Sequence, residues 1–371
     1  MSAIERSRAG MIVFGSPSRY VQGPGALAGI GTEVARLGDS AVCVIDAALM
    51  KPHGDKLSDS CREAGVAARL LPFGGECTEG EVTRLAADAG QGVQIVIGFG
   101  GGKCIDAGKA VAHQLGAKVV TVPGIASTDA PTSHNYVLYA EDHSLLEVRK
   151  LPRNPDLVIV DTAIIAAAPR QFFVAGIGDA IGKCHEVRCC AEAGGRNIFG
   201  ASPAWSSVAL ADACHDVLRR FASDALAAVD RGSPDPALER VTEAVVLMSG
   251  LAFESGGLSV AHSMTRGLTA VAPWSQAMHG LQVAYANIVQ MRAQGADEAE
   301  IDDFAGFSRD LGLPVSLFDL GGRQATDAEI ATIAELTMRS PHIGHLPRVL
   351  DLAGLKGAIR WVEDRYSGGA G

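Results

Sequence analysis

VIGFGGGKCIDAGKAVA, residues 96–112, is the stretch that decides the fold. An apolar run leads into a turn with Gly100, Gly101 and Gly102, and a helix-like pattern follows. Glycines let the backbone approach a bulky anion, and the free N–H groups at a helix start favour phosphate. The segment therefore predicts a phosphate-binding turn, although a tight turn without a ligand would have the same pattern. It is neither a GxGxxG fingerprint nor a Walker loop, because Lys103 is not followed by Ser or Thr.

Similar units surround this stretch in the first part of the chain. Short runs at 41–46, 93–98, 118–122 and 157–160 are nearly all apolar, and segments at 57–64, 79–89 and 105–115 have helical character. Apolar runs of this length are typical of strands that are covered on both faces. The rhythm predicts a Rossmann-like α/β domain with a mostly parallel sheet. Residues 135–140 and 145–149 also predict a hairpin around 141–143.

Helical patterns dominate the rest of the chain, with long ones at 204–224, 236–255, 280–293 and 326–337. Apolar residues recur every three or four positions at Val241, Ala244, Val245, Met248 and Leu251, which predicts one face of an amphipathic helix. We therefore expect an α/β domain over residues 1–161 and an all-α domain over residues 162–371.

The composition of this 371-residue chain indicates which classes of partner and which cell compartment to expect. Its net charge is −10 and it has no dense basic block, which argues against nucleic acid as a partner. No apolar stretch reaches the roughly 18 residues of a membrane helix, so we expect no membrane contact and a cytoplasmic location. The eight cysteines form no C-x-x-C pair, and we expect them to be buried, reduced thiols.

Two histidines and an aspartate have features of metal ligands. Asp179, His262 and His279 each lie among small apolar residues near expected helix starts. A carboxylate and two neutral imidazoles make a three-ligand site with positions left open. Each residue also has a simpler interpretation, because Asp179 could cap a helix and a lone buried histidine is usually a core residue. Spacing alone leaves both interpretations open.

Asp46 ends the apolar run at 41–46. At the end of such a strand, a carboxylate can accept hydrogen bonds from an adenosine ribose and repel a 2′-phosphate. A simple turn residue would look the same in the sequence.

Several segments together resemble the glycerol dehydrogenase branch of the iron-containing alcohol dehydrogenase superfamily. They are PFGGEC (72–77), GGGKCIDAGKA (100–110), IASTDAPTS (125–133), NPDLVIVDT (154–162), AGIGDA (175–180), FESGGL (253–258), and the His262 and MHG (278–280) segments. The similarity runs from Tyr20 to about Pro347, in order and without large gaps. It implies an N-terminal NAD-binding domain, a helical metal- and substrate-binding domain, a zinc ion, a small polyol substrate and a homo-oligomer such as an octamer.

The resemblance also implies roles for individual residues. By position, Asp179, His262 and His279 match the metal ligands and belong to the catalytic set together with Asp129. The resemblance places the cofactor contacts at Asp46, Gly100, Gly101, Gly102, Lys103, Ser127, Ser133 and Tyr139, and the polyol pocket at Asp129 and Phe253. The implied reaction is oxidation of glycerol or a similar vicinal diol, in which the metal polarises the alcohol and a hydride passes to nicotinamide C4.

The chain departs from the family pattern at several positions. Gly124 stands where a threonine is usual, Asn135 replaces an apolar residue, Thr265 stands where a second histidine is frequent, and Met278 replaces an aromatic residue. Lys183 follows Asp179 by one helical turn, where we expect a solvated side chain; the alternative is contact with a substrate phosphate. Lys183 and the altered pocket leave open a related enzyme for a polyol phosphate or 2-hydroxy acid. The Gly124 change leaves open a metal-binding relative without hydride transfer.

Overall fold

The computed structural model describes residues 10–141 and 145–368. By its packing, the chain divides into two compact units. The sheet unit consists of Gly15–Phe173 and Asp224–Gly250, and the helical unit consists of Met1–Phe14, Val174–Ser223 and Leu251–Gly371. Two helical stretches that follow the sheet in sequence, residues 162–173 and 224–250, thus belong to the sheet unit. The assignment of residues 1–161 to NAD and of 162–371 to metal and substrate stays a prediction.

The sheet unit contains a six-stranded sheet in the order β1-β8-β5-β4-β2-β3, and its neighbouring strands are parallel. The strands are β1 (Tyr20–Gly23), β2 (Ser40–Ile45), β3 (Ala67–Pro72), β4 (Ile95–Gly100), β5 (Lys118–Pro123) and β8 (Leu157–Asp161). The parallel sheet expected from the sequence is confirmed. The sequence analysis missed β1 and β3. They are the two edge strands, and β3 is largely exposed, so it lacks a continuous apolar run.

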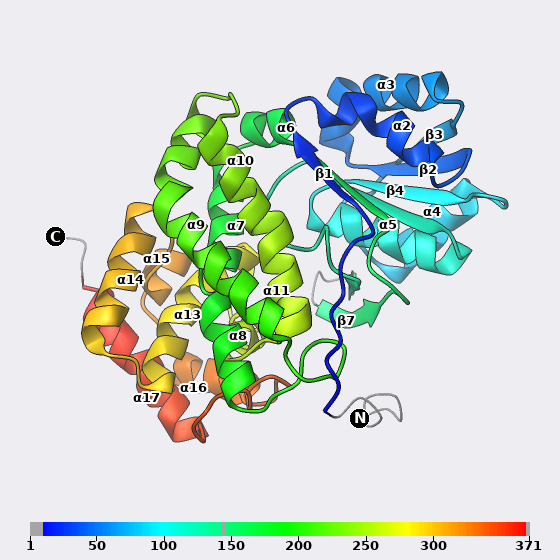
Figure 1. The fold of residues 1–371 in the computed structure, drawn as a ribbon. Coiled ribbons are helices and arrows are strands. Elements are labelled where there is room, and N and C mark those ends of the chain that lie inside the picture. The colour runs from blue at the N-terminus through cyan, green and yellow to red at the C-terminus, as the bar shows by residue number, and fades with distance from the viewer. Residues whose placement is uncertain (1–9, 142–144, 369–371) are drawn as a thin grey trace. The chain divides into compact units, whose positions relative to one another are not determined.

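Helices cover both faces of this sheet (Figure 1). The short helix η1 (Ala26–Gly29), α2 (Ile30–Ala35) and α3 (Ala47–Glu63) pack in the cluster that contains Cys43 and Ile45 of β2. The helices α4 (Glu79–Ala89) and α5 (Gly102–Leu115) pack in the cluster that contains Val42 and Val44. Alternate residues of one strand therefore enter two cores, which explains why the central strands are apolar at every position.

The predicted hairpin is present as β6 (Asn135–Tyr139) and β7 (Leu145–Lys150), which pair antiparallel. Glu141 is described, whereas the rest of the expected turn, residues 142–144, lies outside the described residues.

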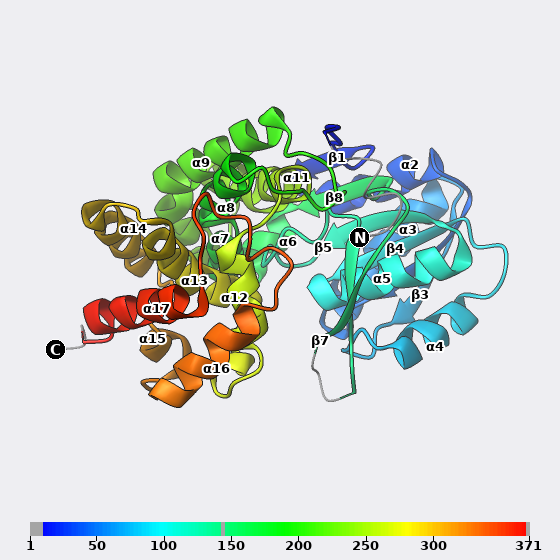
Figure 2. The same ribbon diagram turned by 90° about the horizontal axis from the view of Figure 1, so that it is seen from below.

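After Asp161 the described residues form helices and no strand (Figures 1 and 2). They are α6 (Thr162–Ala167), α7 (Arg170–Ile181), α8 (Lys183–Glu192), α9 (Trp205–Asp230), α10 (Pro236–Glu243), η2 (Ala244–Met248), α11 (Ser249–Gly256), α12 (Val260–Leu268), η3 (Trp274–Gln276), α13 (His279–Gln294), α14 (Glu298–Asp310), α15 (Leu317–Gly321), α16 (Asp327–Thr337) and α17 (Leu352–Tyr366). The predicted all-α second part is thus confirmed. Within the described ranges, no single helix has the length and apolar character to cross a membrane, although one bent pair, Pro236–Gly256 with Val260–Leu268, meets both criteria together.

The predicted amphipathic face over residues 241–251 is interrupted. Val241, Ala244 and Val245 are buried, but Met248 and Leu251 are only half-buried. The cause is η2, a turn of π-helix, whose wider winding shifts the register of the residues after it. A uniform period of 3.6 residues was therefore wrong for the end of this segment.

Candidate active site

Glycines bring two helices of the helical unit into close contact. A Cβ atom on Gly280 of α13 would lie 1.8 Å from the carbonyl oxygen of Ala175 on α7, and one on Gly178 would lie 2.5 Å from the Gly280 carbonyl oxygen. Only glycine permits this approach of the two backbones. Because Asp179 follows Gly178 and His279 precedes Gly280, the contact brings an aspartate and a histidine together from positions 100 residues apart in the sequence.

Asp179, His262 and His279 converge as a possible metal site, and their ligand atoms all lie within 4.8 Å of one another. Asp179 Oδ1 is 3.3 Å from His262 Nε2 and 3.9 Å from His279 Nε2. The Asp179 side chain is buried, whereas that of His279 is 48% exposed. A buried carboxylate beside two imidazole nitrogens is a donor set that suits zinc and similar divalent cations.

Glu186 of α8 supports this cluster from behind. It is fully buried and accepts hydrogen bonds from the backbone N–H groups of Ser259, at 2.9 Å, and His262, at 3.0 Å. The Nδ1 atom of His262 donates to the same carboxylate, which turns Nε2 toward Asp179. Burial alone would lower the pKa of His262, but Glu186 raises it to about 9. A carboxylate behind a ligating histidine is the usual support of such ligands, because it fixes the ring and increases its basicity.

Lys183 lies inside the cluster, and the expectation of a solvated side chain was wrong. Its Nζ is 3.4 Å from both Asp179 Oδ1 and His262 Nε2, and its side chain is 1% exposed. The same Nζ lies 5.1 Å from the centre of the Phe253 ring. The position one turn after Asp179 on a buried helix face explains this placement. The site thus contains a built-in positive charge beside a predicted pocket residue.

The glycine-rich turn in the sheet unit ends β4 and starts α5. Gly101 is the N-cap residue of this 14-residue helix, and no side chain caps the helix start. A Cβ atom on Gly100 would lie 2.6 Å from Cys104 Cβ and 3.0 Å from Asp46 Cβ, so the turn packs too closely for any other residue. Uncapped N–H groups at a helix start suit a phosphate, which is the property that the sequence predicted.

Asp46 lies at the carboxyl end of β2, beside this turn. Its backbone N–H donates to the Phe99 carbonyl at 2.9 Å, and its side chain caps α3 by accepting from Ala48 N at 3.0 Å. The turn-residue and ribose-contact interpretations are therefore compatible, because one carboxylate oxygen caps the helix. Nearby, the Leu49 side chain fills the space that a Cβ atom on Gly124 would need, with Cδ1 at 2.3 Å. Leu49 thus occupies the space beside Gly124, where a threonine is usual in the family.

Lys103 and Tyr139, two predicted cofactor contacts, lie together. Lys103 Nζ is 4.8 Å from the centre of the Tyr139 ring and forms an ion pair with Glu76 Oε2 at 2.5 Å. The lysine side chain is 44% exposed. Glu76 and Lys103 belong to two of the quoted segments that are distant in sequence, and no feature of either segment predicted their pairing.

The loop between β5 and β6 contains three more predicted site residues. Ser127 is half-buried, while Ser133 is buried and its Oγ accepts from Asn135 N at 2.9 Å. Asp129 is buried, and its Oδ2 accepts a hydrogen bond from Ser249 Oγ at 2.7 Å. Ser249 directly follows the π-helical turn, so this irregular turn helps to position Asp129.

A buried ion pair beneath this loop escaped the sequence analysis. Lys109 Nζ donates to the carbonyl oxygens of Ala130, at 2.6 Å, and Asn135, at 2.7 Å, and lies 3.6 Å from Asp106 Oδ1. Burial raises the pKa of Asp106 to about 6, although Lys109 opposes the shift. Asp106 and Lys109 stand three positions apart in the decisive stretch. On a helix, residues at this spacing lie on the same face, so the sequence could have predicted the pair. Glu186 follows Asp179 by two helical turns, and that spacing could likewise have predicted that Glu186 lies near the metal-ligand cluster.

Comparison with known proteins gives one family for this architecture. A family profile described as iron-containing alcohol dehydrogenase matches residues 17–162. A glycolaldehyde reductase from Halobacterium salinarum is 40% identical over 324 residues, which cover 87% of this chain and 89% of that protein. A glycerol dehydrogenase from Pseudomonas putida is 38% identical over 322 residues, which cover 86% and 88%.

A solved structure extends the similarity to the fold of the entire chain. The crystal structure of glycerol dehydrogenase from Schizosaccharomyces pombe superposes with a TM-score of 0.92 at 32% identity. The alignment covers 96% of this chain and 91% of that one. The likeness therefore includes the helical part beyond the residues that the profile matches.

Proposed function

Because the chain belongs to the iron-containing alcohol dehydrogenase family, we propose that it is an NAD-dependent, zinc-dependent dehydrogenase that oxidises glycerol or a similar vicinal diol to the hydroxyketone. The observation that carries this proposal is the cluster of Asp179, His262 and His279 with Glu186 behind it. Both similar enzymes are named for compounds with oxygen atoms on neighbouring carbons, glycerol and glycolaldehyde.

In the proposed site, Asp179, His262 and His279 hold a divalent cation. When bound, this cation supplies Lewis acidity, which lowers the pKa of a nearby hydroxyl. Glu186 keeps the His262 ring in place and fixes its proton on Nδ1, so that Nε2 serves as the ligand atom. Three protein donors leave further coordination positions of the cation open for substrate. Two neighbouring hydroxyls of a diol suit such a site better than the single hydroxyl of a monoalcohol.

For NAD, the proposed contacts are the start of α5 at Gly101 and Gly102 for the pyrophosphate and Asp46 for the ribose. When bound, NAD supplies the hydride acceptor. The uncapped helix start and the close packing around Gly100 support this part of the proposal. We place Asp129, held by Ser249, among the groups that orient the polyol. The proposal includes a cytoplasmic homo-oligomer such as an octamer.

A second candidate function follows from Lys183. A buried ammonium group beside Asp179 and His262 could also form a charge-assisted contact with a phosphate or carboxylate group of a substrate. A related enzyme for a polyol phosphate or a 2-hydroxy acid is therefore the alternative.

A substrate panel decides between these functions. We would measure kcat/KM for 1,2-propanediol against 1-propanol, and for glycerol against glycerol phosphate and lactate, with NAD, before and after removal of the metal with a chelator. The pair 1,2-propanediol and 1-propanol differs by one hydroxyl and is the matched control. We expect the diol to exceed the monoalcohol by at least ~10-fold, equivalent to ~1.4 kcal/mol, and chelation to abolish turnover.

Three outcomes would contradict the proposal. Equal rates for the diol and the monoalcohol would remove the basis for a vicinal diol. A preference for glycerol phosphate or lactate that Lys183→Met abolishes would establish the alternative. Metal binding without turnover of any substrate would establish a non-catalytic relative.

A further inference from the structure

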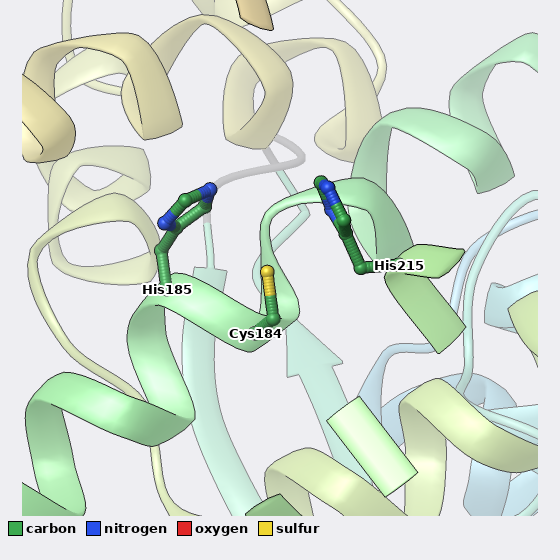
Figure 3. A group of neighbouring side chains, drawn as sticks. All are labelled: Cys184, His185 and His215. Atoms are coloured by element: carbon green, nitrogen blue, oxygen red, sulfur yellow. The ribbon is translucent and has the colours of Figure 1, made fainter. Parts of the chain in front are cut away.

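A second cluster of metal-ligating side chains lies in the helical unit, separate from the site described above. Cys184 and His185 lie on α8, and His215 lies on α9. Their possible ligand atoms all lie within 4.8 Å of one another. Figure 3 shows the Cys184 sulfur between the two imidazole rings. We propose that these three residues bind a second, thiophilic divalent cation such as Zn²⁺, which joins α8 to α9.

The geometry is close to what one zinc ion requires. Zn–S and Zn–N bonds are about 2.3 Å and 2.0–2.1 Å long, so two donors on one tetrahedral ion lie about 3.3–3.6 Å apart. The donor atoms lie within 4.8 Å of each other, so side-chain rotations on binding must bring them closer by up to about 1.5 Å. Three protein donors and one water molecule complete the usual four positions.

His185 supplies the observation that points to a ligand. The residue is 8% exposed, and its Nε2 is buried without a hydrogen-bond partner. One wall beside it is the Phe304 ring, 5.5 Å away between ring centres, which offers no acceptor for this nitrogen. A neutral imidazole is the form that binds metals, and a ring nitrogen without a partner can offer its lone pair to one.

His215 is oriented in the manner of a ligating histidine. Its Nδ1 lies 2.9 Å from the carbonyl oxygen of Ile181. A carbonyl oxygen can only accept, so Nδ1 carries the proton and Nε2 keeps a free lone pair. Histidine ligands are usually held by such a bond from the nitrogen that does not face the metal. The Phe304 ring lies nearly parallel to this imidazole, 6.5 Å away between ring centres.

The thiol decides which cations can bind. Cys184 is buried, and its sulfur is the one soft donor among the three. Binding forms a metal–sulfur bond, breaks the S–H bond and releases one proton to solvent. Only a cation with high affinity for sulfur can drive this exchange, which excludes Mg²⁺ and Ca²⁺. Because Cys184 lies between Lys183 and Glu186, the ion would also stiffen the helix that carries two residues of the first cluster.

Cobalt substitution distinguishes the two clusters, because the first has only oxygen and nitrogen donors. We would load the full-length protein with Co²⁺, record the near-ultraviolet thiolate-to-cobalt charge-transfer band, and count bound metal by elemental analysis after dialysis. We expect two ions per chain and a thiolate band in the wild-type protein. His215→Gln and Cys184→Ser should each retain one ion and lose the band.

Cys189→Ser is the matched control, because Cys189 is a buried thiol on the same helix outside the cluster. It should keep both ions and the band. His262→Ala should lose one ion and keep the band, which makes this result independent of the proposed function. One ion per chain without a thiolate band in wild type would overturn the proposal. A band that persists in both Cys184→Ser and His215→Gln would do the same, since it would report an adventitious ion on another cysteine.

Discussion

At the scale of single residues, Asp46 combines a structural and a proposed functional role. Its carboxylate caps α3, and the same group would repel the 2′-phosphate of NADP. Asp46→Ser separates the roles, because serine also caps helices but carries no charge. We expect the ratio of kcat/KM for NAD to that for NADP to fall by at least ~10-fold, or ~1.4 kcal/mol, with little change in melting temperature.

The matched control for this change is Asp297→Ser, because Asp297 caps α14 in the same way. It should leave the cofactor preference unchanged. Equal kcat/KM for NAD and NADP in the wild-type enzyme would show that Asp46 does not select the cofactor.

At the scale of elements, the proposed metal site depends on how closely α7 and α13 approach. Gly280→Ala would place a Cβ atom 1.8 Å from a backbone oxygen of α7, which cannot rotate away. The helices must separate, and overpacking of this kind typically costs ~1–3 kcal/mol. We therefore expect a lower free energy of unfolding and weaker zinc binding, measured by denaturant titration and by competition with a chelator.

Gly306→Ala is a suitable control, because Gly306 lies inside α14 and a Cβ atom there meets nothing within 4 Å. That substitution should leave zinc affinity unchanged and stabilise the protein by about 0.4–1 kcal/mol. Zinc affinity in Gly280→Ala equal to that of the wild type would mean that the close contact does not position Asp179 and His279.

At the scale of the whole molecule, the residues proposed to bind NAD and zinc belong to different compact units. The proposed NAD contacts lie in the sheet unit, whereas Asp179, His262 and His279 lie in the helical unit. A ligand that binds only the folded state at 100 times its Kd stabilises by ~2.7 kcal/mol. If calorimetry resolves two unfolding transitions, we expect zinc to raise the midpoint temperature of one and NAD to raise that of the other.

His262→Ala should reduce the zinc-dependent shift and leave the NAD-dependent shift intact. A zinc-dependent shift of the wild-type size in this variant would exclude the cluster around Asp179 as the main metal site.

The sequence by itself determined the four inner strands of the sheet, β2, β4, β5 and β8, and the order of the motifs. Apolar runs such as 118–122 can be recognised in the sequence because both faces of a central strand are buried. The glycine-rich turn before α5 can be recognised because few residues permit its geometry. The resemblance then predicted residues for the metal and cofactor sites, and these roles stay predictions.

Only the tertiary structure decided which side chains meet. Lys183 and Glu186 meet His262, and His215 meets Cys184 and His185, because helix packing brings together faces that no local pattern connects. The π-helical turn at 244–248 likewise changes which residues face the core and positions Ser249 at Asp129. The physical reason is that periodicity records local burial, whereas contacts over 30 to 120 residues depend on packing between elements.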